Sequence, residues 1–133
     1  MPLAVTGYLA VFLGAGIGGA LRHAVNLLAA RLLGTGFPYA TLTVNILGSL
    51  AMGVLIGWFT HRSDPGQAWR LFLTTGILGG FTTFSTFSLD AAVLQERGQT
   101  GTAVLYVALS LAAGIGALFA GLVLVRTLFR GEA

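Results

Sequence analysis

The sequence predicts an all-α integral membrane protein whose four helices each cross the bilayer, and three observations support this fold class. Of the 133 residues, 56% are hydrophobic and only 8% are charged, whereas soluble domains carry about 25% charged residues. The apolar residues gather in four runs, each near the roughly 20 residues that a membrane-spanning helix needs. Short polar turns separate the runs without a linker or low-complexity segment, so we expect one domain over residues 1–133.

The predicted spans cover residues 5–33, 39–59, 70–94 and 101–125. The first run is too long for a cleaved signal peptide and has no basic segment before it, which favours a true span. Pro38 stands where helices favour proline, at the start of the second span. Polar residues with glycine or proline at 61–67 and 95–99 predict turns. Four spans place both termini on the same side of the membrane.

The third span holds a segment that is expected to break its own helix. Residues 79–87 combine two glycines, four hydroxyl side chains and three phenylalanines. Adjacent glycines weaken a helix, and hydrocarbon tolerates loosened backbone only where protein buries it or a polar cavity solvates it. We therefore expect a break at Gly79 and Gly80, and we expect this break to mark a functional site.

The charged residues exclude one class of partner and favour neither membrane face strongly. All seven basic residues are arginines, and a net charge of +3 without lysine is a poor surface for nucleic acid. The connections on the side of the termini hold four arginines, against two or three on the other side. Such a weak bias permits insertion in either direction, and two opposed copies would then pair as an antiparallel homodimer.

Small residues and polar residues follow helical spacing in several spans. Gly-x-x-x-Gly spacings that begin at Gly14, Gly53 and Gly76 predict close helix packing. Three spans carry a stripe of neutral hydrogen-bonding groups, which either bridge helices or together line a polar pathway. The stripes are Thr41, Asn45 and Ser49 in the second span, Thr82, Thr83, Ser85 and Thr86 in the third, and Thr102, Tyr106, Ser110 and Gly114 in the fourth.

The chemistry of these stripes favours a small anion over other cargo. The acids Asp64, Asp90, Glu96 and Glu132 are expected at or near span ends. Proton-coupled and cation-coupled carriers usually need an acid inside the membrane, so such a carrier is disfavoured. Hydroxyls and the Asn45 amide donate hydrogen bonds without holding an ion by full charge. Phe84 and Phe87, three residues apart, either present positive ring edges to an anion or pack against lipid and core.

Arg22 is the one formal charge expected within a span. Its cost there is at least about 2.5 kcal/mol on insertion scales. It should therefore face a vestibule, where it attracts anions, or be pinned to backbone carbonyls. The chain has no cysteine, no deep acid and no histidine beside a serine, so we expect no enzymatic activity.

Three segments, residues 14–22, 41–49 and 79–88, resemble the Fluc-type fluoride channels, also called CrcB proteins. The resemblance covers essentially the whole chain. It implies a dual-topology antiparallel homodimer in the cell membrane, with two pores that passively export fluoride. It also implies a structural sodium ion, which is not transported and is held by the backbone carbonyls of Gly79 and Thr82.

The resemblance also assigns roles to individual side chains. It implies a fluoride pathway along Asn45, Phe84, Phe87, Thr41, Thr83, Thr86, Tyr106 and Ser110. Arg22 would belong to a vestibule. Where some relatives continue the polar track with serine, this chain has Gly114.

Two alternatives stay open at this point. A small dual-topology carrier also has four spans, but it would need an acidic residue in the first span, where this chain has Arg22. An assembly subunit of a larger membrane complex would use the glycine faces for packing.

Overall fold

The structure is a computed structural model that describes residues 2–132, except for the side chain of Glu132. All secondary structure in this part is helical. The elements are α1 (Leu3–Leu33), α2 (Tyr39–His61), α3 (Gln67–Leu71), the π-helix η1 (Phe72–Leu78), α4 (Gly79–Phe81), α5 (Phe84–Glu96), α6 (Thr100–Phe129) and the 3₁₀ turn η2 (Arg130–Glu132).

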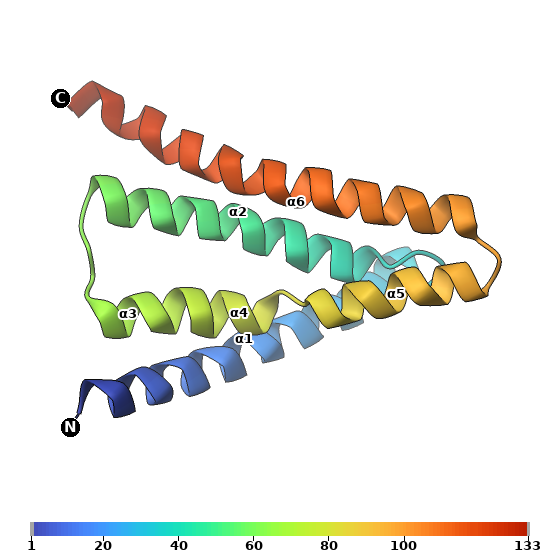
Figure 1. Ribbon diagram of the computed structural model, residues 1–133, viewed down its shortest axis with the longest axis horizontal. Coiled ribbons are helices and arrows are strands. Elements are labelled where there is room, and N and C mark those ends of the chain that lie inside the picture. The colour runs from blue at the N-terminus through green and yellow to red at the C-terminus, as the bar shows by residue number, and fades with distance from the viewer. Residues whose placement is uncertain (1, 133) are drawn as a thin grey trace.

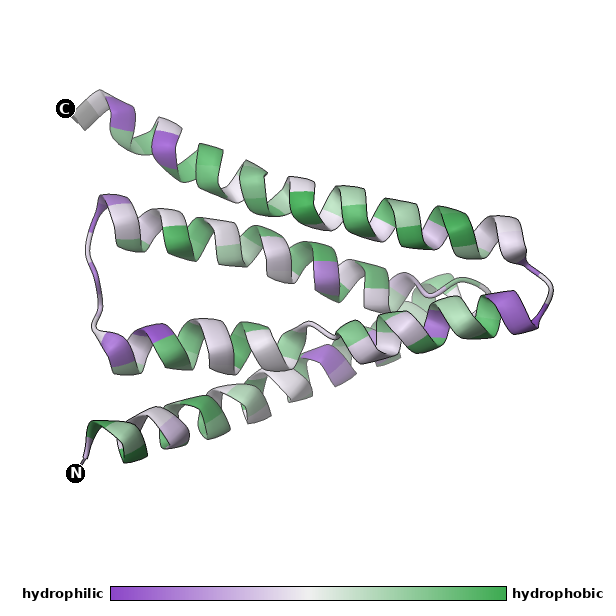
Figure 2. Cartoon of the chain, viewed as in Figure 1, coloured by the Kyte–Doolittle hydropathy of each residue, from purple (hydrophilic) through white to green (hydrophobic). Residues whose placement is uncertain are grey.

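Four stretches are long and apolar enough to cross a membrane, namely residues 3–33, 39–61, 67–96 and 100–129. Every predicted boundary lies within four residues of the observed one. The chain runs back and forth, so both termini lie at the same end of the bundle, as predicted (Figure 1). Hydropathy confirms the pattern, since hydrophilic residues gather at the turns and at few points along the helices (Figure 2).

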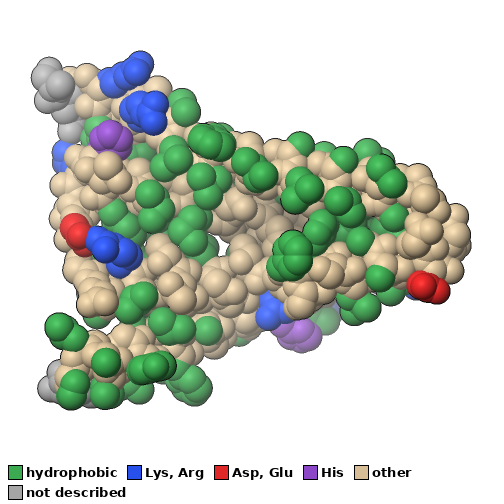
Figure 3. Space-filling model, viewed as in Figure 1, with side chains coloured by type: hydrophobic (Ala, Val, Ile, Leu, Met, Phe, Trp, Pro, Cys, Tyr) green, Lys and Arg blue, Asp and Glu red, His purple; other side chains and the backbone are tan. Residues whose placement is uncertain are grey.

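Apolar side chains face outward along the whole bundle, as lipid contact requires. Large exposed hydrophobic residues occur on α1, α2, α5 and α6. On the face in Figure 3 hydrophobic side chains are spread along the whole length of the bundle, while charged side chains lie mainly towards the two ends. Few side chains are fully buried, and the largest of these are Tyr106 and Val44.

Glycines bring the helix backbones into direct contact. A Cβ atom added to Gly18 of α1 would lie 2.0 Å from the carbonyl oxygen of Ile77 in the third span. A Cβ atom on Gly53 of α2 would lie 2.1 Å from the carbonyl oxygen of Leu118 in α6. No side chain larger than hydrogen fits at these positions, which confirms the close packing that the glycine spacings predict.

The third span departs from a regular α-helix before it breaks. Residues Phe72–Leu78 form a π-helix, at whose end the N–H of Gly79 donates to the carbonyl of Thr74. The Thr74 hydroxyl in turn donates to the Arg70 carbonyl at 2.7 Å. Such turns are rare and often accompany functional sites. The hydrophobic pattern of the sequence contains no signal for this π-helix.

The third span is broken as predicted, but the break lies three residues after the predicted position. Thr82 (φ −85°, ψ 158°) and Thr83 (φ −153°, ψ 114°) are extended, whereas Gly79 (φ −62°, ψ −38°) and Gly80 remain helical. Gly80 instead permits close packing, because a Cβ atom there would lie 2.4 Å from the Ala15 carbonyl oxygen. The break falls on β-branched threonines, which suit extended backbone.

We predict that Gly18→Ala destabilises the fold, because the added methyl group forces α1 away from Ile77. Overpacking of this kind costs about 1–3 kcal/mol, which should appear as a lower melting temperature in detergent. Gly16→Ala is the matched control in the same helix, since its methyl group would meet no atom within 4 Å. Equal melting temperatures for the two variants would contradict the packing argument.

Candidate functional site

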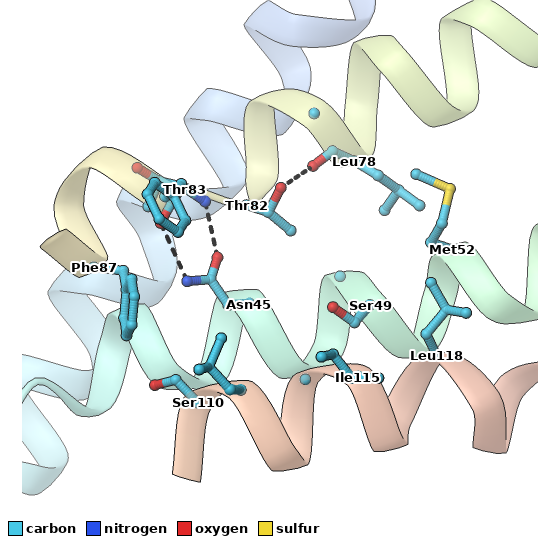
Figure 4. A pocket seen from close by; sticks show the side chains of 15 residues that line it. Asn45, Ser49, Met52, Leu78, Thr82, Thr83, Phe87, Ser110, Ile115 and Leu118 are labelled. Atoms are coloured by element: carbon cyan, nitrogen blue, oxygen red, sulfur yellow. Dashed lines mark hydrogen bonds between the residues drawn. The ribbon is translucent and has the colours of Figure 1, made fainter. Parts of the chain in front are cut away.

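A groove of about 400 Å³ opens beside the helix break, between α2, the third span and α6. Figure 4 shows side chains from these three spans converging on it. Most of the residues singled out from the sequence line it: Asn45, Gly79, Thr82, Thr83, Phe84, Phe87, Ser110 and Gly114. Thr41, Thr86 and Tyr106 lie outside its lining, and so does Arg22.

The Asn45 side chain holds the extended residues at the break of the third span in place. Its Oδ1 accepts a hydrogen bond from the Thr83 N–H at 2.8 Å, and its Nδ2 donates to the Thr83 carbonyl at 3.1 Å (Figure 4). One amide therefore satisfies both backbone groups of a residue that no longer belongs to the preceding helix. In hydrocarbon, where each unsatisfied group costs several kcal/mol, this clamp makes the break tolerable.

The break leaves the carbonyl oxygens of residues 79–82 without their helical donors. The Gly79 carbonyl would normally accept from the Thr83 N–H, which donates to Asn45 instead. The Thr82 carbonyl would accept from the Thr86 N–H, but that group donates to Thr83 Oγ1 at 3.2 Å. These are the two oxygens that the resemblance assigns to a sodium ion. In the described part of the chain no cluster of three or more histidine, aspartate or glutamate side chains offers a metal site.

Arg22 is pinned to a backbone carbonyl, which is one of the two arrangements expected for a charge within a span. Its Nε donates to the Gly80 carbonyl at 3.1 Å. In an unbroken helix this carbonyl would accept from the Phe84 N–H, which lies beyond the break. Arg22 is partly buried, and it pins α1 to the third span where the helix ends.

The second half of the third span begins with a capped helix. Thr83 is the N-cap of α5, and its Oγ1 accepts from the Thr86 N–H. The hydroxyls of Ser85 and Thr86 each lie 3.2 Å from the same oxygen. The three hydroxyls therefore form one local cluster. Within it, the Thr83 hydroxyl is the one that accepts a backbone hydrogen bond.

The two pathway phenylalanines differ strongly in exposure. Phe84 is 75% exposed and Phe87 only 9%, although their ring centroids lie 5.5 Å apart at an interplanar angle of 51°. Phe87 also packs on Tyr106, with centroids 5.3 Å apart. The rings form a continuous series that runs from the open side of the groove to the buried core.

Tyr106 connects α6 to α5 through an acid whose surroundings the sequence did not reveal. Tyr106 is fully buried, and its hydroxyl donates to Asp90 Oδ2 at 3.1 Å. Asp90 was expected as an acid at or near a span end, but it lies six residues before the last residue of α5 and is partly buried. These residues are 16 positions apart, so no helical spacing pointed to the contact.

Ser110 and Gly114 extend the lining of the groove along α6. The Ser110 hydroxyl is buried and has no hydrogen-bond partner among the described residues. At Gly114, a Cβ atom would lie 3.9 Å from Ser49 Oγ on α2. A serine from the neighbouring helix therefore stands beside the position where the fourth span lacks a hydroxyl.

Comparison with known proteins identifies the family. Residues 9–122 match the family model described as "CrcB-like protein, Camphor Resistance (CrcB)". A relative from Methylobacterium nodulans, named fluoride-specific ion channel FluC, is 64% identical over 89% of this chain and 94% of its own length. Relatives with the same name come from Rhodopseudomonas palustris, at 55% identity over 91% of this chain and 98% of theirs, and from Granulibacter bethesdensis, at 54% over 93% and 98%. The chain is a multi-pass membrane protein and belongs to the CrcB family.

Proposed function

We propose that this protein is a fluoride-selective passive channel, an antiparallel homodimer with two pores that releases fluoride from the cytoplasm across the cell membrane. The observation that carries the proposal is the groove in which a clamped helix break, two phenylalanines and an unpartnered hydroxyl meet. The relatives are named as fluoride channels, which supports a transport protein and no enzyme.

The lining suits a small anion that must give up its water. Fluoride is strongly hydrated, so a dry path has to replace a large hydration energy with donors of its own. The Ser110 hydroxyl is a donor without a partner in the described chain, and the Asn45 amide has a second N–H beyond the one that it gives to Thr83. The positive edges of the Phe84 and Phe87 rings would stabilise the ion between these donors.

Two features of a single subunit support the dimer. Phe84 is exposed although it lines the groove, so a second copy would complete the wall there. Gly79 has no steric reason to be glycine within the subunit, because a Cβ atom would meet only the Thr74 carbonyl oxygen, at 3.7 Å. A second backbone that approaches at Gly79 would supply that reason.

A structural sodium ion fits the backbone at the break. The Gly79 and Thr82 carbonyls lack their helical donors, and a hard cation prefers oxygen ligands. When bound, the ion would supply the positive charge that unwound carbonyls need inside a membrane. Asn45 and Arg22 would keep these oxygens in place by fixing the neighbouring residues, Thr83 and Gly80.

Export needs no coupling to another ion. A membrane potential of 100 mV, negative inside, drives each outward-moving anion with about 2.3 kcal/mol. Protonated fluoride that enters from acidic surroundings would dissociate in the cytoplasm, and the channel would release the trapped anion.

We predict that the purified protein, reconstituted in liposomes loaded with potassium fluoride and sodium, releases fluoride when valinomycin is added. A fluoride electrode follows the release, and a parallel chloride assay should detect little. When sodium is replaced by N-methyl-D-glucamine throughout preparation, the release should fall, because the carbonyls at the break lose their ion. Absence of fluoride release from folded protein in sodium would overturn the proposal.

We predict that Phe84→Ile and Phe87→Ile each lower fluoride release at least about tenfold, since isoleucine keeps the apolar bulk but has no positive ring edge. The same liposome assay measures the effect, and leakage of empty vesicles sets the baseline. Trp58→Ile is a control, because Trp58 lies outside the groove lining. Unchanged release by both phenylalanine variants would assign the rings to packing alone.

We predict that Asn45→Ala both destabilises the fold and abolishes fluoride release. The change leaves the Thr83 N–H and carbonyl without their partner, at about 1–3 kcal/mol for each group, and should lower the melting temperature in detergent. Ser49→Ala is the matched control one helical turn along α2 and should melt at the original temperature. A normal melting temperature for Asn45→Ala would show that the clamp does not hold the break.

A further inference from the structure

A second cavity lies at the end of the bundle opposite the termini. Its volume is about 360 Å³, and its walls come from the last turns of α1, the connection between α1 and α2, the first turn of α2, and α5. Figure 1 places this connection and the end of α5 at the same end of the molecule. In contrast to the mostly apolar groove, several polar side chains line it: Asn26, Thr35, Thr41, Thr86, Asp90 and Arg97.

The cavity continues the line of polar residues beyond the groove. Thr41 lies one helical turn before Asn45 on α2, and Thr86 directly precedes Phe87 on α5. Thr41 and Thr86 line the cavity, whereas Asn45 and Phe87 line the groove.

The Phe87 ring lines the groove and packs on the ring of Tyr106. Tyr106 reaches Asp90 on the cavity side, and one turn later on α6 Ser110 faces the groove. The contacts from Phe87 through Tyr106 to Asp90 therefore run from a residue that lines the groove to one that lines the cavity.

Two charged side chains line the cavity, and they differ in how they are engaged. The Asp90 carboxylate accepts a hydrogen bond from the buried Tyr106 hydroxyl. The Arg97 side chain has no hydrogen bond or ion pair with any residue of the described chain. Only its backbone is engaged, since its N–H donates to the carbonyls of Val93 and Gln95 at the end of α5. The guanidinium is therefore available to an anion at the cavity.

We propose that this cavity is an anion-collecting mouth of the pathway and that Arg97 is the residue that concentrates fluoride in it. The inference rests on the proposed channel function and adds a site and a residue to it. A cation in a cleft with low-dielectric walls raises the local concentration of anions, and salt weakens this effect. The Debye length is about 10 Å at 0.1 M salt and about 3 Å at 1 M, so the contribution of Arg97 should appear at the lower salt concentration.

The alternative role for Arg97 is structural. A positive side chain at a helix C-terminus interacts favourably with the helix dipole, and Arg97 follows the last residue of α5. This role would change the stability of the protein. It would not make the effect of the substitution on the current depend on salt concentration. The two roles can therefore be separated.

The test compares single-channel fluoride currents in planar bilayers for Arg97→Gln, Arg97→Lys and Arg31→Gln at about 0.1 M and about 1 M salt. Arg31 is the matched control, because it is exposed, lies near the same end in the last turn of α1, and does not line the cavity. Both glutamine variants remove one positive charge from the same side of the chain, so their effect on insertion is matched.

We expect Arg97→Gln to lower the current about twofold at the lower salt concentration and to leave it unchanged at the higher one. Arg97→Lys should retain the current, and Arg31→Gln should behave like the original protein. Equal currents for the two glutamine variants at low salt would overturn the proposal, as would an equal loss for Arg97→Gln at both salt concentrations. Absence of current from the original protein would instead refute the channel function itself.

Discussion

The site depends on one interaction, the two hydrogen bonds between the Asn45 amide and the backbone of Thr83. A helix that breaks inside a bilayer exposes backbone groups that no water can satisfy. An asparagine side chain offers a donor and an acceptor with the spacing of a peptide group, so it can stand in for a helical neighbour. With that support from α2, two extended residues persist in the middle of an apolar bundle, and the groove forms beside them.

The remaining groups at the break are divided among the other helices. Arg22 of α1 donates to the Gly80 carbonyl, and the hydroxyl of Thr83, the N-cap of α5, accepts from the N–H of Thr86, the third residue of that helix. The carbonyl oxygens of Gly79, Phe81 and Thr82 keep no helical donor, and of these residues Gly79 and Thr82 line the groove. The two oxygens that belong to groove-lining residues are the ones to which a sodium ion is assigned in the proposed function.

The sequence predicted the helices, their ends and the side of the termini, because bilayer thickness and hydropathy fix these features. Helical spacing placed several polar residues on facing stripes, and the structure brings only some of them into the groove. Asn45, Ser49, Thr82, Thr83 and Ser110 line it, whereas Thr41, Thr86 and Tyr106 lie outside its lining. The sequence did not locate the break, because the adjacent glycines serve packing against Ala15 and the extended threonines depend on Asn45, 38 residues away. The contact between Tyr106 and Asp90 is equally long-range, and the π-helix follows from backbone packing that no local pattern records.

The clamp also constrains how the proposed channel can handle its ion. Asn45 cannot turn to follow a passing anion, because rotation would release both backbone groups of Thr83. A donor that remains free to reorient is the Ser110 hydroxyl, one turn from the ring of Tyr106, which is held by its hydrogen bond to Asp90. Selectivity in this arrangement would come from a rigid frame with few mobile donors. Any rotation of the Asn45 amide would remove the support that keeps the break intact in the membrane.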